Sequence, residues 1–409
     1  MEKSLQSIVD QVRTASVARS PLRIQGGGTK DFLADAQTNA LPNLSANIDS
    51  TQLPGEVLDT RMHSGIVSYE PSELVITAKA GTPLAEIEAA LAAHGQCLPF
   101  EPPRFAAAHT DGNAAGKHGG TVGGMVAAGL SGPARASVGA LRDYVLGVHI
   151  VNGKAEHLVF GGQVMKNVAG YDMSRLIAGS WGMLGVVTEV SLKVLPVAPA
   201  EATLCFEMAQ ADALAQLNHW GGEPLPLNAS NWVMDSVGGV PTPLLFVRLR
   251  GAVAAVEAAC KTMLAQHKGT RMDNAQASGD WQLSRDLQLP FFYTQNTSLA
   301  APAQQACLWR ISVPQTAPVL DLPCASAAGQ LVDWHGAQRW LWAPASADAQ
   351  IRAAAQAAGG SAMLFRGHAP LGSSRFAALK APLDRIHRQL KAEFDPAGIF
   401  NPGRMPWFA

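Results

Sequence analysis

Charge is scarce in this sequence and is divided evenly between the two signs. Charged side chains make up 15% of the 409 residues, and 31 lysines and arginines are balanced by 32 aspartates and glutamates. Soluble domains usually carry about 25% charged residues, and nucleic-acid-binding domains add a clear basic surplus. The balance excludes electrostatically driven nucleic-acid binding as the default function. The 47% of hydrophobic residues predicts well-filled cores and apolar surface for a partner.

Cysteines and long hydrophobic runs are also lacking. The five cysteines include no CxxC pair, so a disulfide framework or a cysteine-ligated cluster is disfavoured and a reducing cytoplasm fits. No apolar run approaches the roughly 18–20 residues that a membrane span needs. Near the start of the chain, Glu2 and Asp10 stand where a secretory signal needs an unbroken apolar run. We therefore expect a cytoplasmic protein without a signal peptide or a transmembrane segment.

Two common nucleotide-binding motifs are missing as well. Gly26 and Gly28 begin a GxGxxG motif, but Asp31 stands in place of its last glycine. Asp111 stands where a GxxxxGK[ST] motif needs its first glycine, and His118 stands where that motif needs serine or threonine. A dinucleotide-binding Rossmann domain and a P-loop NTPase are therefore disfavoured.

The length predicts two to three domains, and the composition indicates one boundary. Pro196 and Pro199 follow a predicted strand at 186–195 and lie among small residues, as in a linker. We place the boundary at residue 198, which gives domains at 1–198 and 199–409. Beyond it, alternating strand-like and helix-like segments approximate the split βαβ order of a ferredoxin-like unit. These segments are 202–208, 210–220, 230–234, 244–250 and 252–265.

Other elements are predicted on both sides of this boundary, and no internal repeat is visible. The front half contains a helix near 5–12, strands at 22–25 and 74–80, a helix after Thr82-Pro83, and a hairpin around Asn152-Gly153. The back half contains strands at 307–313, 338–342 and 361–366, and helices at 346–357 and 376–394.

Three short segments could carry chemistry. After the strand at 22–25, the run Gly26 to Thr29 lets consecutive N–H groups converge on a phosphate without a cation. On its own, such a run is more often a plain turn. Thr121-Val122-Gly123-Gly124 is typical of a helix start whose free N–H groups face an anion, although close helix packing favours the same residues.

The third segment runs from Lys166 to Asp172. It places a cation, a bend at Gly170, the ring of Tyr171 and a carboxylate within seven residues. The functional interpretation of Lys166 is only slightly favoured over a solvated surface charge. Asp172 could equally be the N-cap of the short helix that follows.

These segments, in this order and followed by Gly185-Val186-Val187, resemble the FAD-binding domain of the vanillyl-alcohol oxidase/p-cresol methylhydroxylase (PCMH) superfamily. The resemblance covers about residues 1–198. More narrowly, TVGGMVAAGLSGP and VMKNVAGYDMSRLIAGSWGMLGVVTEVSLKVLP look like the FAD-binding subunits of bacterial glycolate oxidases. The closing FDPAGIFNPGRM is similar to the tail of the lactate and glycolate dehydrogenase group.

The resemblance implies a fold class and a cofactor. It implies an α+β protein, with a two-lobed PCMH-type FAD-binding domain followed by a smaller ferredoxin-like α+β domain whose C-terminal tail returns to the FAD domain. The cofactor is FAD, with its pyrophosphate held by the first glycine run and the reduced ring near the cation of the third segment. The implied FAD-binding residues are Gly26, Gly27, Gly28, Thr29, Thr121, Gly123, Gly124, Lys166, Gly170, Tyr171, Asp172, Val186 and Val187.

Two departures from the family pattern bear on function. Members that tether FAD covalently use a histidine where Thr29 stands, so we expect a non-covalent flavin; Gln25 also replaces a frequent arginine, which would weaken phosphate contacts. Relatives that oxidise 2-hydroxy acids carry a metal-binding cluster like HxGDGNxH, whereas His335 and His368 are isolated here. We therefore expect no metal site, and no catalytic residue is assigned.

Three functions remain open on these grounds. The first is an FAD-binding subunit of a glycolate oxidase complex, relaying electrons or stabilising the assembly beside a catalytic flavin subunit and an iron–sulfur subunit. Such a complex would place the chain in the cytoplasm, at the inner face of the cell membrane. The second is a stand-alone FAD-dependent 2-hydroxy-acid dehydrogenase, which the missing histidine cluster disfavours. The third is a structural subunit with an empty FAD fold.

Overall fold

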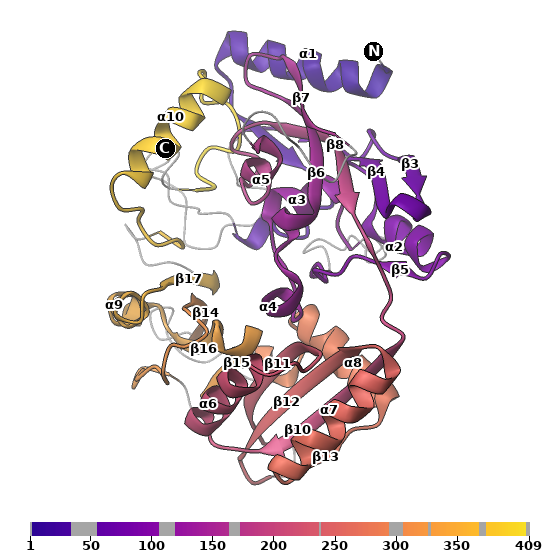
Figure 1. The fold of residues 1–409 in the computed structure, drawn as a ribbon. Coiled ribbons are helices and arrows are strands. Elements are labelled where there is room, and N and C mark those ends of the chain that lie inside the picture. The colour runs from indigo at the N-terminus through magenta and orange to yellow at the C-terminus, as the bar shows by residue number, and fades with distance from the viewer. Residues whose placement is uncertain are drawn as a thin grey trace. The chain divides into compact units, whose positions relative to one another are not determined.

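The structure is a computed structural model that describes residues 2–33, 55–105, 119–162, 172–236, 239–293, 306–325, 329–367 and 374–405. Its contacts divide the chain into two compact units (Figure 1). The first unit comprises Met1–Leu130, Ala140–Val197 and Ala378–Ala409, and the second comprises Ser131–Gly139 and Ala198–Ala377. Among the described residues, no helix combines the length and the apolarity that crossing a membrane requires.

The segment Ser131–Gly139 differs from the sequence-based division, because it packs with the second unit rather than with the residues around it. The indole N–H of Trp334 donates to the Gly132 carbonyl at 2.9 Å, and the Arg135 guanidinium lies 4.7 Å from the centre of the same indole ring. These contacts span about two hundred residues of sequence, so local patterns do not indicate them.

An antiparallel sheet forms the centre of the first unit, in the order β3-β4-β8-β6-β7. Its middle strand, β8, reads VVTEVSLK and is buried along nearly its whole length, which suits its β-branched residues. Helix α3 packs on β4 and β8, while α5 packs on β6 and β7. The strands are β3 (Ile66–Glu70), β4 (Val75–Lys79), β6 (Val145–Val151), β7 (His157–Gly161) and β8 (Val186–Lys193).

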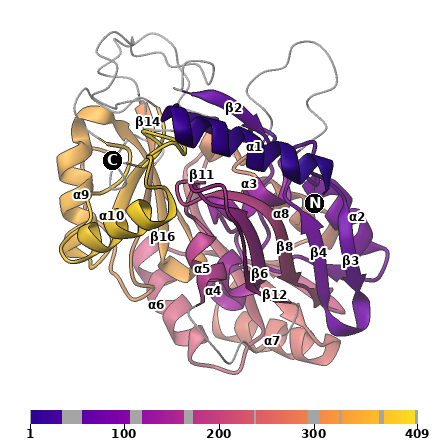
Figure 2. The same ribbon diagram turned by 90° about the horizontal axis from the view of Figure 1, so that it is seen from above.

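The helices of the first unit surround this sheet, and α1 crosses one end of its strands (Figure 2). They are α1 (Lys3–Ala18), α2 (Leu84–Ala92), α3 (Val122–Ala128), α5 (Met173–Ile177) and α10 (Leu383–Phe394). The short strands β5 (Gln96–Cys97) and β9 (Leu195–Pro196) pair with each other. The predicted helix at 376–394 begins later than expected, because Pro382 precedes its first residue and proline is tolerated only at a helix start.

A parallel strand pair, β1 (Leu22–Gln25) and β2 (Glu56–Asp59), positions the functional groove of this unit. Ile8 and Val12 of α1 pack against Leu22 and Leu58 in one apolar core. The C-terminal tail holds the other edge of β1, since Leu22 exchanges backbone hydrogen bonds with Ile399 and Asn401. Strand β1 is therefore fixed on both edges just before it runs into the glycines at 26–28.

The second unit is built on one antiparallel sheet in the order β13-β10-β12-β11-β15-β16-β14-β17. Its strands are β10 (Ala200–Glu207), β11 (Leu227–Asp235), β12 (Thr242–Gly251), β13 (Gly269–Arg271), β14 (Ala306–Ser312), β15 (Gln330–Asp333), β16 (Gln338–Pro344) and β17 (Ser361–Arg366). Its helices are α4 (Arg135–Val138), α6 (Gln210–Gly221), α7 (Val253–Gln266), α8 (Asn274–Arg285) and α9 (Asp348–Ala357).

The strand order confirms the ferredoxin-like prediction and reveals that it occurs twice. In the first half, β10, α6, β11, β12, α7 and β13 follow the split βαβ succession and give the spatial order first, third and second strand, with the fourth outside the first. Strands β14 to β17 have the same spatial order read in the opposite direction: second, third and first strand, with the fourth outside the first. The two halves of the sheet meet where β11 pairs with β15. Between β14 and β15, the described residues 313–325 form no helix that corresponds to α6; Val313, Ala317, Leu320 and Leu322 pack in the core instead.

Candidate functional site: a glycine-lined groove

A groove lies within the first unit. Four segments line it: the end of β1 with the loop that follows, the start of α3, the stretch 181–187, and the C-terminal tail. The lining residues include Gln25, Gly26, Gly27, Gly28, Thr29, Lys30, Asp31, Thr60, Gly120, Thr121, Gly123, Gly124, Trp181, Gly182, Gly185, Val187, Asn401 and Arg404.

The loop after β1 presents main-chain donors without acceptors. Within the described part of the chain, the backbone N–H groups of residues 26–30 donate no hydrogen bond. Gly28 has φ +66°, which favours glycine, and a Cβ atom at Gly27 would lie 3.2 Å from the Cα of Gly120. Residues 26–28 are half-buried and Thr29 and Lys30 are buried, so this run of N–H groups is open to a ligand with acceptor atoms.

Lys30 adds a cation to this loop, and sequence reasoning missed it. Its side chain is 8% exposed and lines the groove, with Nζ 3.4 Å from the Thr29 hydroxyl and 5.8 Å from the centre of the Phe105 ring. Burial lowers the pKa of Lys30 to about 8, although the neighbouring Asp31 carboxylate acts in the opposite direction. Asp31 itself is paired with Arg404 of the tail at 3.0 Å.

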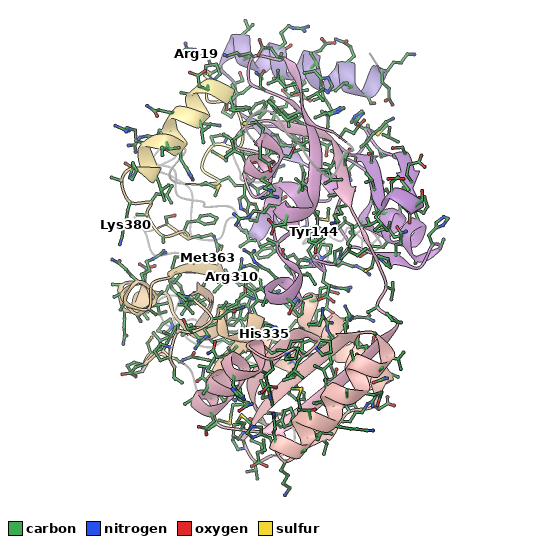
Figure 3. All side chains as sticks on the ribbon, in the orientation of Figure 1. Arg19, Tyr144, Arg310, His335, Met363 and Lys380 are labelled. Carbon is green, nitrogen blue, oxygen red and sulfur yellow. The ribbon has the colours of Figure 1, made fainter. Side chains whose placement is uncertain are left out.

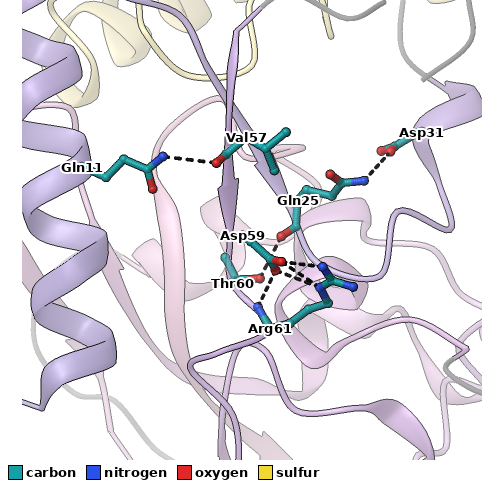
Figure 4. A network of polar contacts seen from close by, with 7 residues as sticks. All are labelled: Gln11, Gln25, Asp31, Val57, Asp59, Thr60 and Arg61. Carbon is teal, nitrogen blue, oxygen red and sulfur yellow. Dashed lines mark hydrogen bonds and ion pairs between the residues drawn. The ribbon is translucent and has the colours of Figure 1, made fainter. Parts of the chain in front are cut away.

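The side chain of Gln25 links the start of this loop to Asp31 at its end (Figure 4). The amide Nε2 of Gln25 donates to the Asp31 carboxylate at 3.2 Å, and the backbone carbonyl of Gln25 accepts from the Thr60 backbone N–H at 2.9 Å. Beside it, Arg61 forms a bidentate pair with Asp59 that is largely exposed to solvent. Gln25 and Lys30 both line the groove.

The prediction that the start of α3 offers free N–H groups is wrong. Val122 donates to the Thr82 carbonyl, Gly123 donates to the Ala80 carbonyl, and Gly124 donates to the Thr121 side chain that caps the helix. A Cβ atom at Gly123 would lie 2.7 Å from that of Ala80, so this glycine serves close packing. Thr121 and Gly124 line the groove as surface, without supplying free donors.

The other predicted site residues separate into three groups. Val187 lines the groove, whereas the side chain of Val186 is fully buried in the core with α1, as strand alternation requires. Asp172 does not line it: its carboxylate caps α5 by accepting from the Arg175 N–H and pairs with the Arg175 side chain. Lys166, Gly170 and Tyr171 lie outside the described residues.

Further lining residues come from segments that sequence reasoning did not assign. Trp181 has φ +54° and its N–H donates to Ala127, which turns the chain back along the groove. Gly182 has φ +72°, and a Cβ atom there would lie 2.6 Å from Nδ2 of Asn401. The clustering of glycines at 179–185 was the available indication. Nothing local connects it to Asn401 in the tail.

Two buried titratable groups of the second unit, His335 (labelled in Figure 3) and Asp333, are held by hydrogen bonds within that unit. The His335 ring lies between the hydroxyls of Ser230 and Ser137, each at 3.0 Å, and burial lowers its pKa to about 4. Asp333 accepts from Asn231, Gln338 and Trp340, while burial raises its pKa to about 6. Among the described residues, no group of three or more His, Cys, Asp or Glu side chains is placed to hold a metal ion.

The groove offers main-chain donors and the Lys30 ammonium, which lack acceptors or an ion-pair partner among the described residues, together with apolar or glycine surface from Trp181, Gly124 and Val187. Such a donor set fits a diphosphate, and the remaining surface fits a flat ring system. The absence of side chains at residues 26–28 lets the ligand approach the main chain directly.

Comparisons with known proteins agree with this chemistry. A family model described as an FAD binding domain matches residues 3–161. Glycolate oxidase subunit GlcE of Escherichia coli (strain K12) is 43% identical over 400 residues, which cover 98% of this chain and 97% of that protein. Glycolate oxidase subunit GlcD of Bacillus subtilis (strain 168) is 38% identical over 96 residues, 24% of this chain and 20% of that protein.

More distant similarity extends over the whole fold. D-lactate dehydrogenase of Archaeoglobus fulgidus is 28% identical over 176 residues, 43% of this chain and 33% of that protein. The solved structure of an alkyldihydroxyacetonephosphate synthase has a TM-score of 0.61 at 14% identity and covers 97% of this chain and 74% of that chain. At that identity the likeness shows a shared fold.

Proposed function

The chain belongs to the family of glycolate oxidase subunit GlcE, and from this premise we propose that it is the FAD-binding subunit of a glycolate oxidase complex. As a member of an FAD-dependent oxidoreductase family, it binds FAD. The complex would oxidise glycolate to glyoxylate. Its catalytic flavin subunit would resemble GlcD, and an iron–sulfur subunit would pass the electrons on at the inner face of the membrane.

One observation carries the proposal: the N–H groups of residues 26–30, which line the groove, donate no hydrogen bond within the part of the chain that the structure describes. Gly26, Gly27, Gly28 and Thr29 would hold the pyrophosphate, and Gly124 and Val187 would lie along the rest of the cofactor. Thr29 stands where a covalent link would need histidine, so the flavin would be held without a covalent bond. Bound FAD supplies one- and two-electron transfer, while the protein sets its position and potential.

The assignment as a relay or assembly subunit follows from what the second unit lacks. Its histidines at 335 and 368 are not part of a cluster in the sequence, and the one that is described is neutral and hydrogen-bonded to two serines. Activation of a 2-hydroxy acid needs a base or a metal near the substrate. We therefore assign glycolate oxidation to the partner flavin subunit rather than to this chain.

Co-expression with the other two subunits tests the proposal directly. An affinity tag on this chain should capture both subunits, and the complex should contain more than one flavin per copy of this chain. The chain purified alone should contain FAD that acid or denaturant releases into the supernatant. Glycolate-dependent dye reduction by the isolated chain would favour the stand-alone dehydrogenase, and a flavin-free chain after purification with added FAD would favour a structural subunit.

A further inference from the structure

Among the described residues, Lys30 is a cation of the groove that forms no ion pair. Its ammonium makes one hydrogen bond, to the Thr29 hydroxyl, so two of its three N–H donors have no acceptor among the described residues. The adjacent carboxylate of Asp31 is already bound by Arg404 and by the Gln25 amide. A buried cation without a paired anion is unfavourable, and a ligand that brings negative charge removes that cost.

The position of this ammonium matches that of the free main-chain donors. A Cβ atom at Gly120 would lie 3.5 Å from Nζ of Lys30 and 3.4 Å from the Thr29 hydroxyl, and a Cβ atom at Gly27 would lie 3.2 Å from the Gly120 Cα. Nζ therefore lies across Gly120 from the glycine run, in the same part of the groove. A glycine at 120, with φ +92°, keeps the space between the two sets of donors open.

We propose that Lys30 binds the pyrophosphate of FAD together with the main-chain N–H groups of residues 26–30, and that binding of the cofactor takes up a proton at this lysine. The inference rests on the proposed FAD-binding function. It adds a charged partner to a site for which the sequence indicated main-chain donors alone.

The pH dependence follows from the charges that face this ammonium. Among the described residues they are Asp31 on its own segment, Arg404 of the tail, which is bound to Asp31, and Arg104 beside Phe105, which is paired with Glu88 of α2. None of these supplies Lys30 with a free anion. The pKa of the lysine is about 8, and a bound pyrophosphate raises it, since an opposite charge favours the charged form. FAD affinity should therefore be constant below about pH 8 and fall as the pH rises above it.

Fluorescence titration of the flavin-stripped chain with FAD, at pH 7 and at pH 9.5, tests this inference, because the two values lie below and above the Lys30 pKa of about 8. Lys30→Met should raise the Kd for FAD at pH 7 by about ten- to hundredfold, the usual worth of a hydrogen bond to a charged group. Wild type should lose affinity between the two pH values. Lys30→Arg should keep its affinity at both, because a guanidinium stays protonated.

Calorimetry in buffers of different ionisation enthalpy gives a second readout that a packing role would not change. Near pH 9, wild type should take up a large fraction of a proton on binding FAD, and neither variant should take up any. Lys154→Met, at an exposed turn, is the matched control and should behave as wild type. Thermal melting curves should show both Lys30 variants folded.

The outcomes distinguish a failure of the lysine inference from a failure of the proposed function. Wild type that binds FAD with the same affinity as Lys30→Met, or without proton uptake, would overturn the role of the lysine and leave the proposed function intact. Wild type that binds neither FAD nor ADP would overturn the proposed function and the lysine inference together.

Discussion

The groove of the first unit and the buried polar groups of the second unit satisfy their hydrogen bonds in opposite ways. In the second unit, the fully buried Arg339 donates to the carbonyls of Gly336, Ala317 and Pro318, and Asp333 accepts from three side chains. In the first unit, the backbone N–H groups of residues 26–30 have no acceptor among the described residues. The same holds for two of the three N–H donors of the Lys30 ammonium.

This difference teaches how to separate a structural polar group from a functional one. Leaving a buried donor unpaired costs about 1–3 kcal/mol, so donors without a partner in the chain need water or another molecule as the acceptor. The networks around Arg339, Asp333 and His335 supply their own acceptors. The N–H groups of residues 26–30 find none among the described residues, which is why we propose that the ligand binds in the first unit.

Gly27→Val should have the largest effect, because its side chain would block a ligand from approaching the backbone N–H groups of residues 26–30. A Cβ atom would already lie 3.2 Å from Gly120, and a β-branched side chain would fill the space that the ligand needs. We expect FAD retention to be lost, with a Kd raised more than about hundredfold, a change of about 3 kcal/mol. Flavin absorbance per chain after gel filtration measures it.

The matched control for this variant is Gly221→Val, at the exposed end of α6, where a Cβ atom meets nothing within 4 Å. It should retain FAD, and circular dichroism should show both variants folded. Normal FAD content in Gly27→Val would contradict the assignment of the glycine run and would remove the contrast between the two units.

His335→Asn tests the closed side of the comparison through its pH dependence. The pKa of His335 is about 4 when folded and about 6.5 when unfolded, so the neutral ring stabilises the fold fully above pH 6.5. This stability is lost as the pH falls from about 6.5 through about 4. Over that range, the wild-type free energy of unfolding should fall by on the order of 2 kcal/mol more than that of His335→Asn.

Asparagine suits this position, because His335 has φ +54° and asparagine tolerates that conformation. Chemical denaturation at pH 7 and pH 5, followed by tryptophan fluorescence, measures the difference. FAD content at pH 7 should not change in this variant. Equal acid sensitivity of wild type and variant would show that the ring is not the titrating group.

Much of the fold and part of the site could be predicted from the sequence. The ferredoxin-like order followed from alternating strand and helix patterns, and the glycine run at 26–28 marked the groove because only glycine permits such close approach. Helix α8 was missed because its apolar residues are sparse, and its best indication is the Asp273 cap. Strand β15 was missed because four residues carry too little pattern.

The rest of the site depends on contacts between residues that are far apart in the sequence, which local patterns do not indicate. Sequence reasoning assigned no role to Lys30, because only the folded chain buries its side chain in the groove and brings it near Phe105. The free N–H groups expected at Gly123 were absent because Ala80, some forty positions earlier, accepts from them. Arg404 reaches Asp31 from the opposite end of the chain, which no local motif indicates.

Arg404→Met should have a moderate effect on the open side of the comparison. It releases the carboxylate of Asp31, which is only 7% exposed and would then attract the Lys30 ammonium and repel a phosphate. We expect the Kd for FAD to rise about three- to tenfold. Adding Asp31→Asn in the same chain should restore most of the affinity, and failure of that rescue would show that Arg404 acts by another route.

Arg61→Ala should have the smallest effect, and it sharpens the comparison because Arg61 adjoins Thr60 of the groove. Its bidentate pair with Asp59 satisfies it, and its side chain is 65% exposed, so solvent screens the interaction. We expect the free energy of unfolding to change by less than about 1 kcal/mol, and the Kd for FAD to stay as in wild type. A loss of affinity like that of Arg404→Met would mean that proximity to the groove, rather than an unpaired buried donor, identifies its binding residues.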